Sequence, residues 1–80
     1  METIKNIINI DSEILGGQPV FSGTRVPIQT LFSHLEKGIS LADFLEDFPT
    51  VSKEQAIALL EIAEKICTSK NIEKIYESAA

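Results

Sequence analysis

Three apolar stripes with the spacing of an α-helix follow one another between Pro27 and Cys67, and they constrain the fold of this chain more than any other feature. In each stripe, apolar side chains recur every third or fourth position, which places them on one face of a helix. Gly38 ends the first stripe and Pro49 ends the second, because glycine suits the position after a helix and proline cannot continue one. The sequence therefore predicts three amphipathic helices.

The third of these helices has the clearest start. Ser52 and Gln55 have the spacing of a capping box, in which each residue satisfies a backbone N–H of the other. Apolar residues cover more than half of this helix, so it is either central to the fold or in contact with another molecule. Cys67 lies on its central stripe, and we expect it to be buried. The expected helices span residues 27–37, 41–48 and 53 to about 69.

The N-terminal part of the chain has the composition of strands and turns. Isoleucines between Ile4 and Ile10 favour a strand, Gly16-Gly17-Gln18-Pro19 is a turn signal, and Val20-Phe21 is a second short apolar segment. We expect two short strands around a loop. The whole chain is expected to form one domain, 1–80, with a strand and turn arm over 1–26, a three-helix core over 27–69 and a tail with a short helix over 70–80.

The connection between the second and third helices is short. Only Pro49-Thr50-Val51 separates them, which is the geometry of a helix-turn-helix with the first helix as its support. The expected fold class is mainly α, a homeodomain-like three-helix bundle preceded by a small N-terminal β element. In that fold Lys53, Gln55 and Lys65 would face DNA, with Gln55 as the base-reading residue. A three-helix bundle that does not bind DNA is the alternative.

The net charge of −5 bears on the partners of this chain. Most of the acidic excess lies in residues 41–80. Nucleic acid is a polyanion, and most non-specific affinity for it comes from Lys and Arg side chains that neutralise phosphates. We therefore expect a basic protein to be a more natural partner than free nucleic acid.

Membrane and secretory signals are not expected in this sequence. The longest apolar runs are a few residues, far below the ~20 residues that a membrane-spanning helix needs. No early segment combines a basic start, an apolar stretch and a small-residue cleavage site. We expect a cytoplasmic protein without a membrane partner.

Cys67 and His34 are the only cysteine and the only histidine. One cysteine forms no intrachain disulfide, and the two residues are too few for a tetrahedral zinc site. No nucleophile and base stand in a recognisable catalytic arrangement. We therefore expect no catalytic, metal or cofactor site, and a packing role for His34 at or near the surface. A partner subunit is the remaining way to stabilise so small a core.

Acidic residues on the second helix could form a surface for such a partner. Asp43 lies three and four positions before Glu46 and Asp47, so the three share one side of the helix. A solvated face that meets a basic protein fits them better than a metal or acid–base site. Together with the apolar excess of the third helix and tail, the expected partner surface comprises Asp43, Glu46, Asp47, Glu61, Ile62, Ile66, Ile72, Ile75 and Tyr76.

A glycine- and proline-bearing corner precedes the first helix. Its glycines allow positive φ angles, its prolines fix extended geometry before them, and Arg25 carries a guanidinium that forks into carboxylates or carbonyls. Arg25 either holds the corner against the helices through internal hydrogen bonds or ion pairs, which we favour, or contacts a phosphate or a partner. The corner residues are Gly16, Gly17, Pro19, Gly23, Thr24, Arg25 and Pro27.

The runs GGQPVFSGTRVPIQTL and EKGISLADFLEDFPTVSKEQAIALL resemble the family known as domain of unknown function 433. The resemblance covers about residues 7–67, and the glycine-threonine-arginine corner is its most distinctive part. It implies a homeodomain-like three-helix domain after a small β element, and an antitoxin-like role beside a PIN-like nuclease toxin. No catalytic residue comes with it.

Three hypotheses follow. The first is a non-catalytic, antitoxin-like protein that binds a PIN-like nuclease toxin. The second is a helix-turn-helix transcriptional regulator of its own operon, in which a homodimer paired through Ile7–Ile10 places two third helices on DNA. The third is a purely structural homo-oligomer whose tail swaps between copies.

Overall fold

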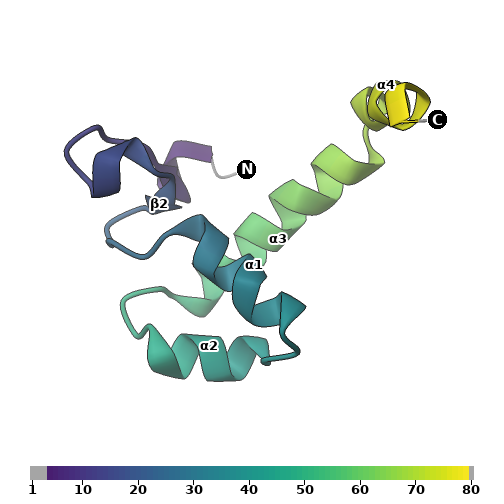
Figure 1. The fold of residues 1–80 in the computed structure, drawn as a ribbon. Helices are drawn as coiled ribbons and strands as arrows, with labels where there is room; N and C mark the ends of the chain where they lie inside the picture. The colour runs from purple at the N-terminus through teal and green to yellow at the C-terminus, as the bar shows by residue number, and fades with distance from the viewer. Residues whose placement is uncertain (1–3, 80) are drawn as a thin grey trace.

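The computed structural model describes residues 4–79, which form four helices and a small two-stranded sheet (Figure 1). The ends of the expected arm and tail, residues 1–3 and 80, lie outside the described residues. A mainly helical fold with a small N-terminal β element is thus confirmed. The helices are α1 (Ile28–Glu36), α2 (Leu41–Asp47), α3 (Lys53–Thr68) and α4 (Lys70–Ala79), the strands are β1 (Ile8–Asn9) and β2 (Val20–Phe21), and short 3-10 turns span Ile4–Asn6 and Leu15–Gly17.

The two strands pair as the sequence predicts, around a loop. They are antiparallel, with Ile8 opposite Phe21 and Asn9 opposite Val20. The loop contains a feature that the sequence does not reveal, because Leu15 has a φ of 47° before Gly16 and Gly17. Such left-handed backbone costs an ordinary residue about 1–2 kcal/mol. The turn therefore includes Leu15 as well as the glycines.

Local hydrogen bonds fix the starts of the later helices. The Ser40 hydroxyl accepts the Asp43 N–H at 3.1 Å at the start of α2. At the start of α3, the Ser52 hydroxyl accepts the Gln55 N–H at 3.0 Å, and Gln55 Oε1 accepts the Ser52 N–H at 3.1 Å. The predicted capping box is therefore present. α1 begins one residue later than predicted, since Pro27 has extended backbone and caps the helix.

Gly38 ends α1 as the sequence predicts. Its φ of 80° is a left-handed value that glycine adopts without strain. The Ile39 N–H then donates to the His34 carbonyl at 2.9 Å, and the Gly38 N–H donates to the Leu35 carbonyl at 3.0 Å. These two bonds are the Schellman pattern, which satisfies carbonyls left free at the helix end. The chain thereby turns sharply into α2.

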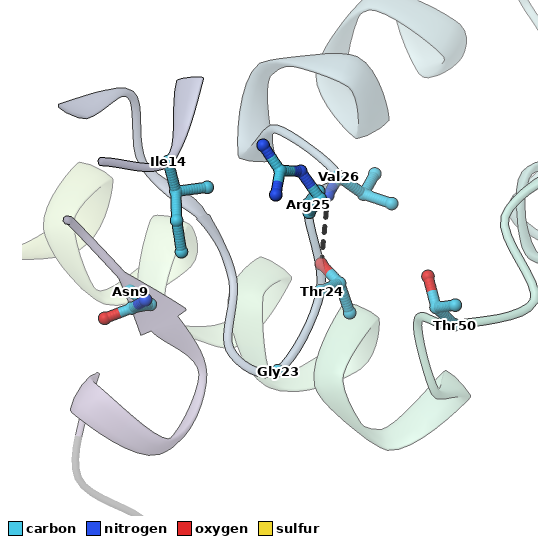
Figure 2. Close-up of a pocket in the computed structure, with 7 residues that line it drawn as sticks. All are labelled: Asn9, Ile14, Gly23, Thr24, Arg25, Val26 and Thr50. Atoms are coloured by element: carbon cyan, nitrogen blue, oxygen red, sulfur yellow. Dashed lines mark hydrogen bonds between the residues drawn. The ribbon is translucent and has the colours of Figure 1, made fainter. Parts of the chain in front are cut away.

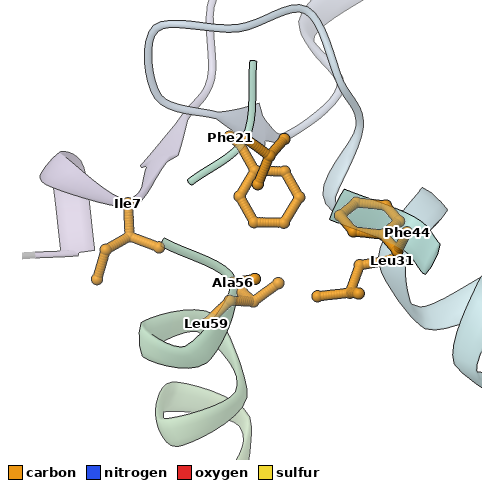
Figure 3. Close-up of a cluster of buried hydrophobic side chains, with 7 residues drawn as sticks. Ile7, Phe21, Leu31, Phe44, Ala56 and Leu59 are labelled. Atoms are coloured by element: carbon orange, nitrogen blue, oxygen red, sulfur yellow. The ribbon is translucent and has the colours of Figure 1, made fainter. Parts of the chain in front are cut away.

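Buried side chains from Ile7, β2, α1, α2, the α2–α3 connection and the first half of α3 meet in one core (Figure 3). Phe44 is fully buried, and its ring centroid lies 6.2 Å from that of Phe21 and 5.0 Å from that of Phe48. His34 packs edge-on against Phe44 and Phe48, with centroids 5.5 Å apart, and is half-buried as predicted. The core cluster comprises Ile7, Phe21, Leu31, Phe44, Val51, Ala56 and Leu59.

The core ends at Leu59, in the first half of α3. The rest of this helix extends beyond α1 and α2 and carries α4 at its far end (Figure 1). No side chain between residues 60 and 79 is buried. The prediction that Cys67 is buried is therefore wrong: Cys67 is exposed, because α1 and α2 do not reach that part of α3. The short helix predicted in the tail is confirmed as α4.

Within residues 4–79, no helix is both long enough and apolar enough to cross a membrane.

Candidate functional site

The corner between β2 and α1 is held by its own backbone. The Phe21 N–H donates to the Val26 carbonyl at 3.0 Å, and the Thr24 N–H donates to the Phe21 carbonyl at 3.0 Å. Gly23 has a φ of 78°, which closes the turn between these bonds. Because Phe21 is fully buried, the turn is anchored directly to the core.

Two side chains lock this corner further. The Thr24 hydroxyl donates to the Phe21 carbonyl at 2.8 Å and accepts the Val26 N–H at 3.0 Å. Gln55 Nε2, from the first turn of α3, donates to the Ser22 carbonyl at 2.8 Å. The corner is therefore fixed both within itself and to the helix that carries the core residues Ala56 and Leu59.

Arg25 does not take part in this locking. Its side chain is exposed, and within residues 4–79 no hydrogen bond or ion pair joins its guanidinium to another group. The favoured prediction that Arg25 holds the corner is therefore wrong, because Thr24 and Gln55 perform that role. The guanidinium lies on the Ile14 side of a pocket, away from Thr50 (Figure 2). This pocket has a volume of about 570 Å³ and is lined by Asn9, Ile14, Gly23, Thr24, Arg25, Val26 and Thr50.

The remaining corner residues shape the path of the chain. The Pro19 carbonyl accepts the Ile28 N–H at 3.0 Å, so the turn before β2 supplies an acceptor to the start of α1. Pro27 forms a bridge with Val20, which brings the two ends of the corner together. Gly16 and Gly17 are farther along the β1–β2 loop and do not line the pocket.

The acidic residues of α2 form an exposed face. Asp43, Glu46 and Asp47 are all exposed, and α2 carries no basic residue. In the described part of the chain, no group of three or more acidic, histidine or cysteine side chains is arranged to hold a metal ion. The chemistry open to this face is electrostatic attraction of a cationic surface.

The apolar residues of the expected partner surface lie along the end of α3 and on α4, which we call the C-terminal arm (residues 60–79). Ile66, Ile75 and Tyr76 are 58%, 61% and 77% exposed. Ile62 and Ile72 are half-buried, and Glu61 is exposed. A groove of about 490 Å³ lies where the N-terminal turn meets α3, and its lining is Ile4, Ile7, Ala58, Glu61, Ile62, Lys65 and Ile66.

The residues expected to face DNA do not form one patch. Lys53 and Lys65 are exposed but lie at opposite ends of α3, roughly 18 Å apart along the helix axis. Gln55 is engaged at both ends of its amide, by Ser52 and by the Ser22 carbonyl. A base contact by Gln55 would require these internal bonds to break.

Four pocket residues are absent from the predicted corner residues: Val26, which directly follows Arg25, and three residues from other segments. Asn9, Ile14 and Thr50 come from β1, the β1–β2 loop and the α2–α3 connection. None of them belongs to a local motif, so only the packing of these segments reveals them. The bond from Gln55 to the Ser22 carbonyl could not be predicted either. The capping box of Gln55 is a local pattern, whereas Ser22 lies 33 positions away in the sequence.

Comparison with known proteins gives a consistent family assignment. The model of the family described as "Protein of unknown function (DUF433)" matches residues 8–63, which confirms the resemblance drawn from the two sequence runs. Uncharacterized protein y4eO from Sinorhizobium fredii (strain NBRC 101917 / NGR234) is 35% identical over 51 residues, 64% of this chain and 23% of that protein. The chain thus spans less than a quarter of this curated relative.

A similar solved structure is that of a DUF433 member protein from Anabaena variabilis ATCC 29413, determined by crystallography at 2.00 Å resolution. The TM-score is 0.65 and the sequence identity is 27%. The similarity covers 94% of this chain and 69% of that one. A share this large extends beyond residue 63, where the family region ends, and into at least part of α4.

Proposed function

This chain belongs to the DUF433 family of proteins of unknown function, and we propose that it is a non-catalytic, antitoxin-like binding protein whose partner is a PIN-like nuclease toxin. The supporting observation is the C-terminal arm, which exposes apolar side chains at the end of the molecule farthest from the core. A domain that presents such a surface without a catalytic arrangement is suited to docking another protein.

α4 carries this proposal. It has ten residues, none buried, and its main contacts within the chain are with α3. Ile72, Ile75 and Tyr76 share one face, and two of them are mostly exposed. An isolated helix shorter than about 12–15 residues is marginal in water. A hydrophobic groove on a partner would bury this face and stabilise the helix.

Charge supports a basic partner. The exposed acidic face of α2 has no cation of its own, and the chain as a whole has a net charge of −5. A nuclease that handles RNA presents cationic residues to phosphates. The acidic face would accelerate association with such a surface, while the apolar face of α4 would provide most of the affinity.

The experiment that tests this function is co-purification of the tagged chain with the product of the adjacent gene, which the proposal predicts to be a small nuclease-like protein. We expect a stable complex from the unaltered chain. Replacing both Ile75→Asn and Tyr76→Asn should weaken binding about a hundredfold, because aromatic and apolar anchors dominate such interfaces.

Lys74→Asn with Glu77→Asn is the matched control. These residues lie on the opposite side of α4 at helical spacing, and the pair changes no net charge. Binding should stay within about threefold of the unaltered chain. Equal loss in both double variants, or no complex with the unaltered chain, would contradict the proposal.

A second candidate is a DNA-binding regulator that acts as a homodimer, and the connection between α2 and α3 favours it. Residues 48–52 join the two helices, and α1 packs beside α2. This arrangement supports a homeodomain-like, helix-turn-helix type of three-helix bundle. The uncompensated carboxylates of α2 and the internal bonds of Gln55 weigh against it.

Gel-shift assays at low salt on the DNA upstream of the gene test this candidate. Retardation that disappears in the Lys53→Ala, Lys65→Ala double variant would support it, because these two lysines are the only cations on α3. No retardation by the unaltered chain would exclude it.

A further inference from the structure

We propose that Arg25 and the pocket beside it bind a carboxylate group on a protein partner, carried by an aspartate or glutamate next to an apolar residue. This inference rests on the proposed function in one respect, namely that the partner is a protein. It concerns a different part of the molecule from the C-terminal arm. The argument uses the rigidity of the corner, the isolation of the guanidinium and the chemistry of the lining.

Several intramolecular hydrogen bonds hold the corner, although it lies partly at the surface. Four intramolecular hydrogen bonds close the turn, two from backbone groups and two through the Thr24 hydroxyl, and Gln55 ties it to α3. Val20 and Phe21, at its base, are fully buried. A side chain that projects from such a frame loses little backbone freedom on binding, which favours affinity.

The guanidinium of Arg25 has no partner among residues 4–79, although the chain is strongly acidic. Its exposed side chain forms no ion pair or hydrogen bond within that range, and the sequence has 12 acidic residues. Five N–H donors are thus directed to solvent at the edge of a pocket. The frame keeps these donors accessible to an external acceptor.

The lining indicates which acceptor fits. Arg25 is the only charged residue among the seven that line the pocket, while Ile14 and Val26 are apolar. A guanidinium binds a carboxylate through two parallel hydrogen bonds, and the apolar residues suit an adjacent aliphatic side chain. Asn9 and Thr50 add polar groups whose side chains make no hydrogen bond in the described part of the chain.

A nucleic-acid phosphate is the less suitable acceptor. Binding to nucleic acid gains its affinity from several cations that neutralise successive phosphates. Here the lining has a single cation, and the pocket residue Thr50 follows the acidic helix α2. A carboxylate from a protein needs only the one guanidinium and benefits from the apolar part of the pocket.

The test is an NMR titration of the isolated chain with the capped peptide acetyl-Ile-Glu-Ile-amide, and with acetyl-Ile-Gln-Ile-amide as the neutral match. We expect saturable shifts of the Arg25 Nε–H and of the Gly23, Thr24 and Val26 amides with the first peptide. The glutamine peptide should bind at least about tenfold more weakly, because it lacks the charge-assisted pair.

Variants distinguish the contribution of the two parallel guanidinium N–H donors from the contribution of positive charge alone. Arg25→Gln should abolish the shifts, and Arg25→Lys should weaken binding about tenfold, since lysine keeps the charge but not the paired donors. Lys37→Gln removes an equal charge from the exposed end of α1 and should leave binding unchanged. Amide spectra of each variant establish that it is folded.

Three results would overturn the proposal: no saturable shifts at about 10 mM peptide, equal binding of the two peptides, or tighter binding of inorganic phosphate or oligothymidylate than of the glutamate peptide. The last result would assign the corner to nucleic acid. Because the titration needs only this chain and a peptide, its outcome is independent of whether α4 binds the nuclease-like partner.

Discussion

Residues 4–59 and the C-terminal arm, residues 60–79, bury their side chains to very different extents. The first region contains every buried residue of the described chain: Ile7, Val51 and residues of β2, α1, α2 and the first half of α3. The arm contains none, although its apolar residues have the same helical spacing as those of α1. Regular amphipathic patterning therefore accompanies a packed core in one region and an open surface in the other.

This difference separates stability from binding. In the first region, apolar residues face one another across several elements and supply the free energy of folding. In the arm, Ile66, Ile75 and Tyr76 face solvent, so their burial is available to a second molecule. Mutations should therefore affect folding in the first region and partner binding in the second.

The largest effect on folding is expected at Phe44. This fully buried ring contacts Phe21, His34 and Phe48, so Phe44→Ala leaves a cavity where four aromatic rings meet. The free energy of unfolding should fall by about 3–5 kcal/mol, as is typical when a buried phenylalanine is truncated. Urea unfolding followed by circular dichroism measures this loss. A change below about 1 kcal/mol would show that the core is not centred on Phe44.

An intermediate effect is expected at Gln55, which joins α3 to the corner. Gln55→Ala removes one half of the capping box and the bond to the Ser22 carbonyl. We expect a loss of about 1–2 kcal/mol in the free energy of unfolding. The neighbouring Glu54 is exposed, and Glu54→Ala serves as the control in the same urea experiment. Similar losses in the two variants would mean that the bond from Gln55 to the corner contributes little.

The smallest effect on folding is expected at Ile75, where 61% of the side chain is exposed. Ile75→Ala should change the free energy of unfolding by less than about 0.5 kcal/mol in the isolated chain. Leu31→Ala, which truncates a fully buried side chain of the core, should lower the free energy of unfolding by about 2–5 kcal/mol. The comparison between the two regions fails if these two truncations have equal effects on thermal unfolding.

Much of the fold follows from local sequence signals. Ser52 with Gln55 and Gly38 mark helix ends through hydrogen bonds that span only a few residues, and the structure contains them as predicted. The two strands around a glycine turn are equally local. Such signals are reliable because the atoms that satisfy them lie close together along the chain.

The features that could not be predicted depend on contacts between residues that are far apart in the sequence. Periodicity identifies the apolar face of α3 but not how much of the helix has neighbours, so Cys67 was wrongly placed in the core. The charge of Arg25 predicted an internal pairing, yet its exposed guanidinium forms no hydrogen bond or ion pair in the described chain. The bond from Gln55 to Ser22, across 33 positions, depends on the packing of α3 against β2.

Amide hydrogen exchange of the chain, alone and with the proposed nuclease-like partner, tests the central claim most directly. Without the partner, amides of α4 should exchange close to the rate of an unfolded chain, while those of α1 and the first half of α3 should exchange slowly. With the partner, α4 should become protected and the core amides should change little. Slow exchange of α4 in the isolated chain, or unchanged exchange of α4 in the complex, would contradict the account.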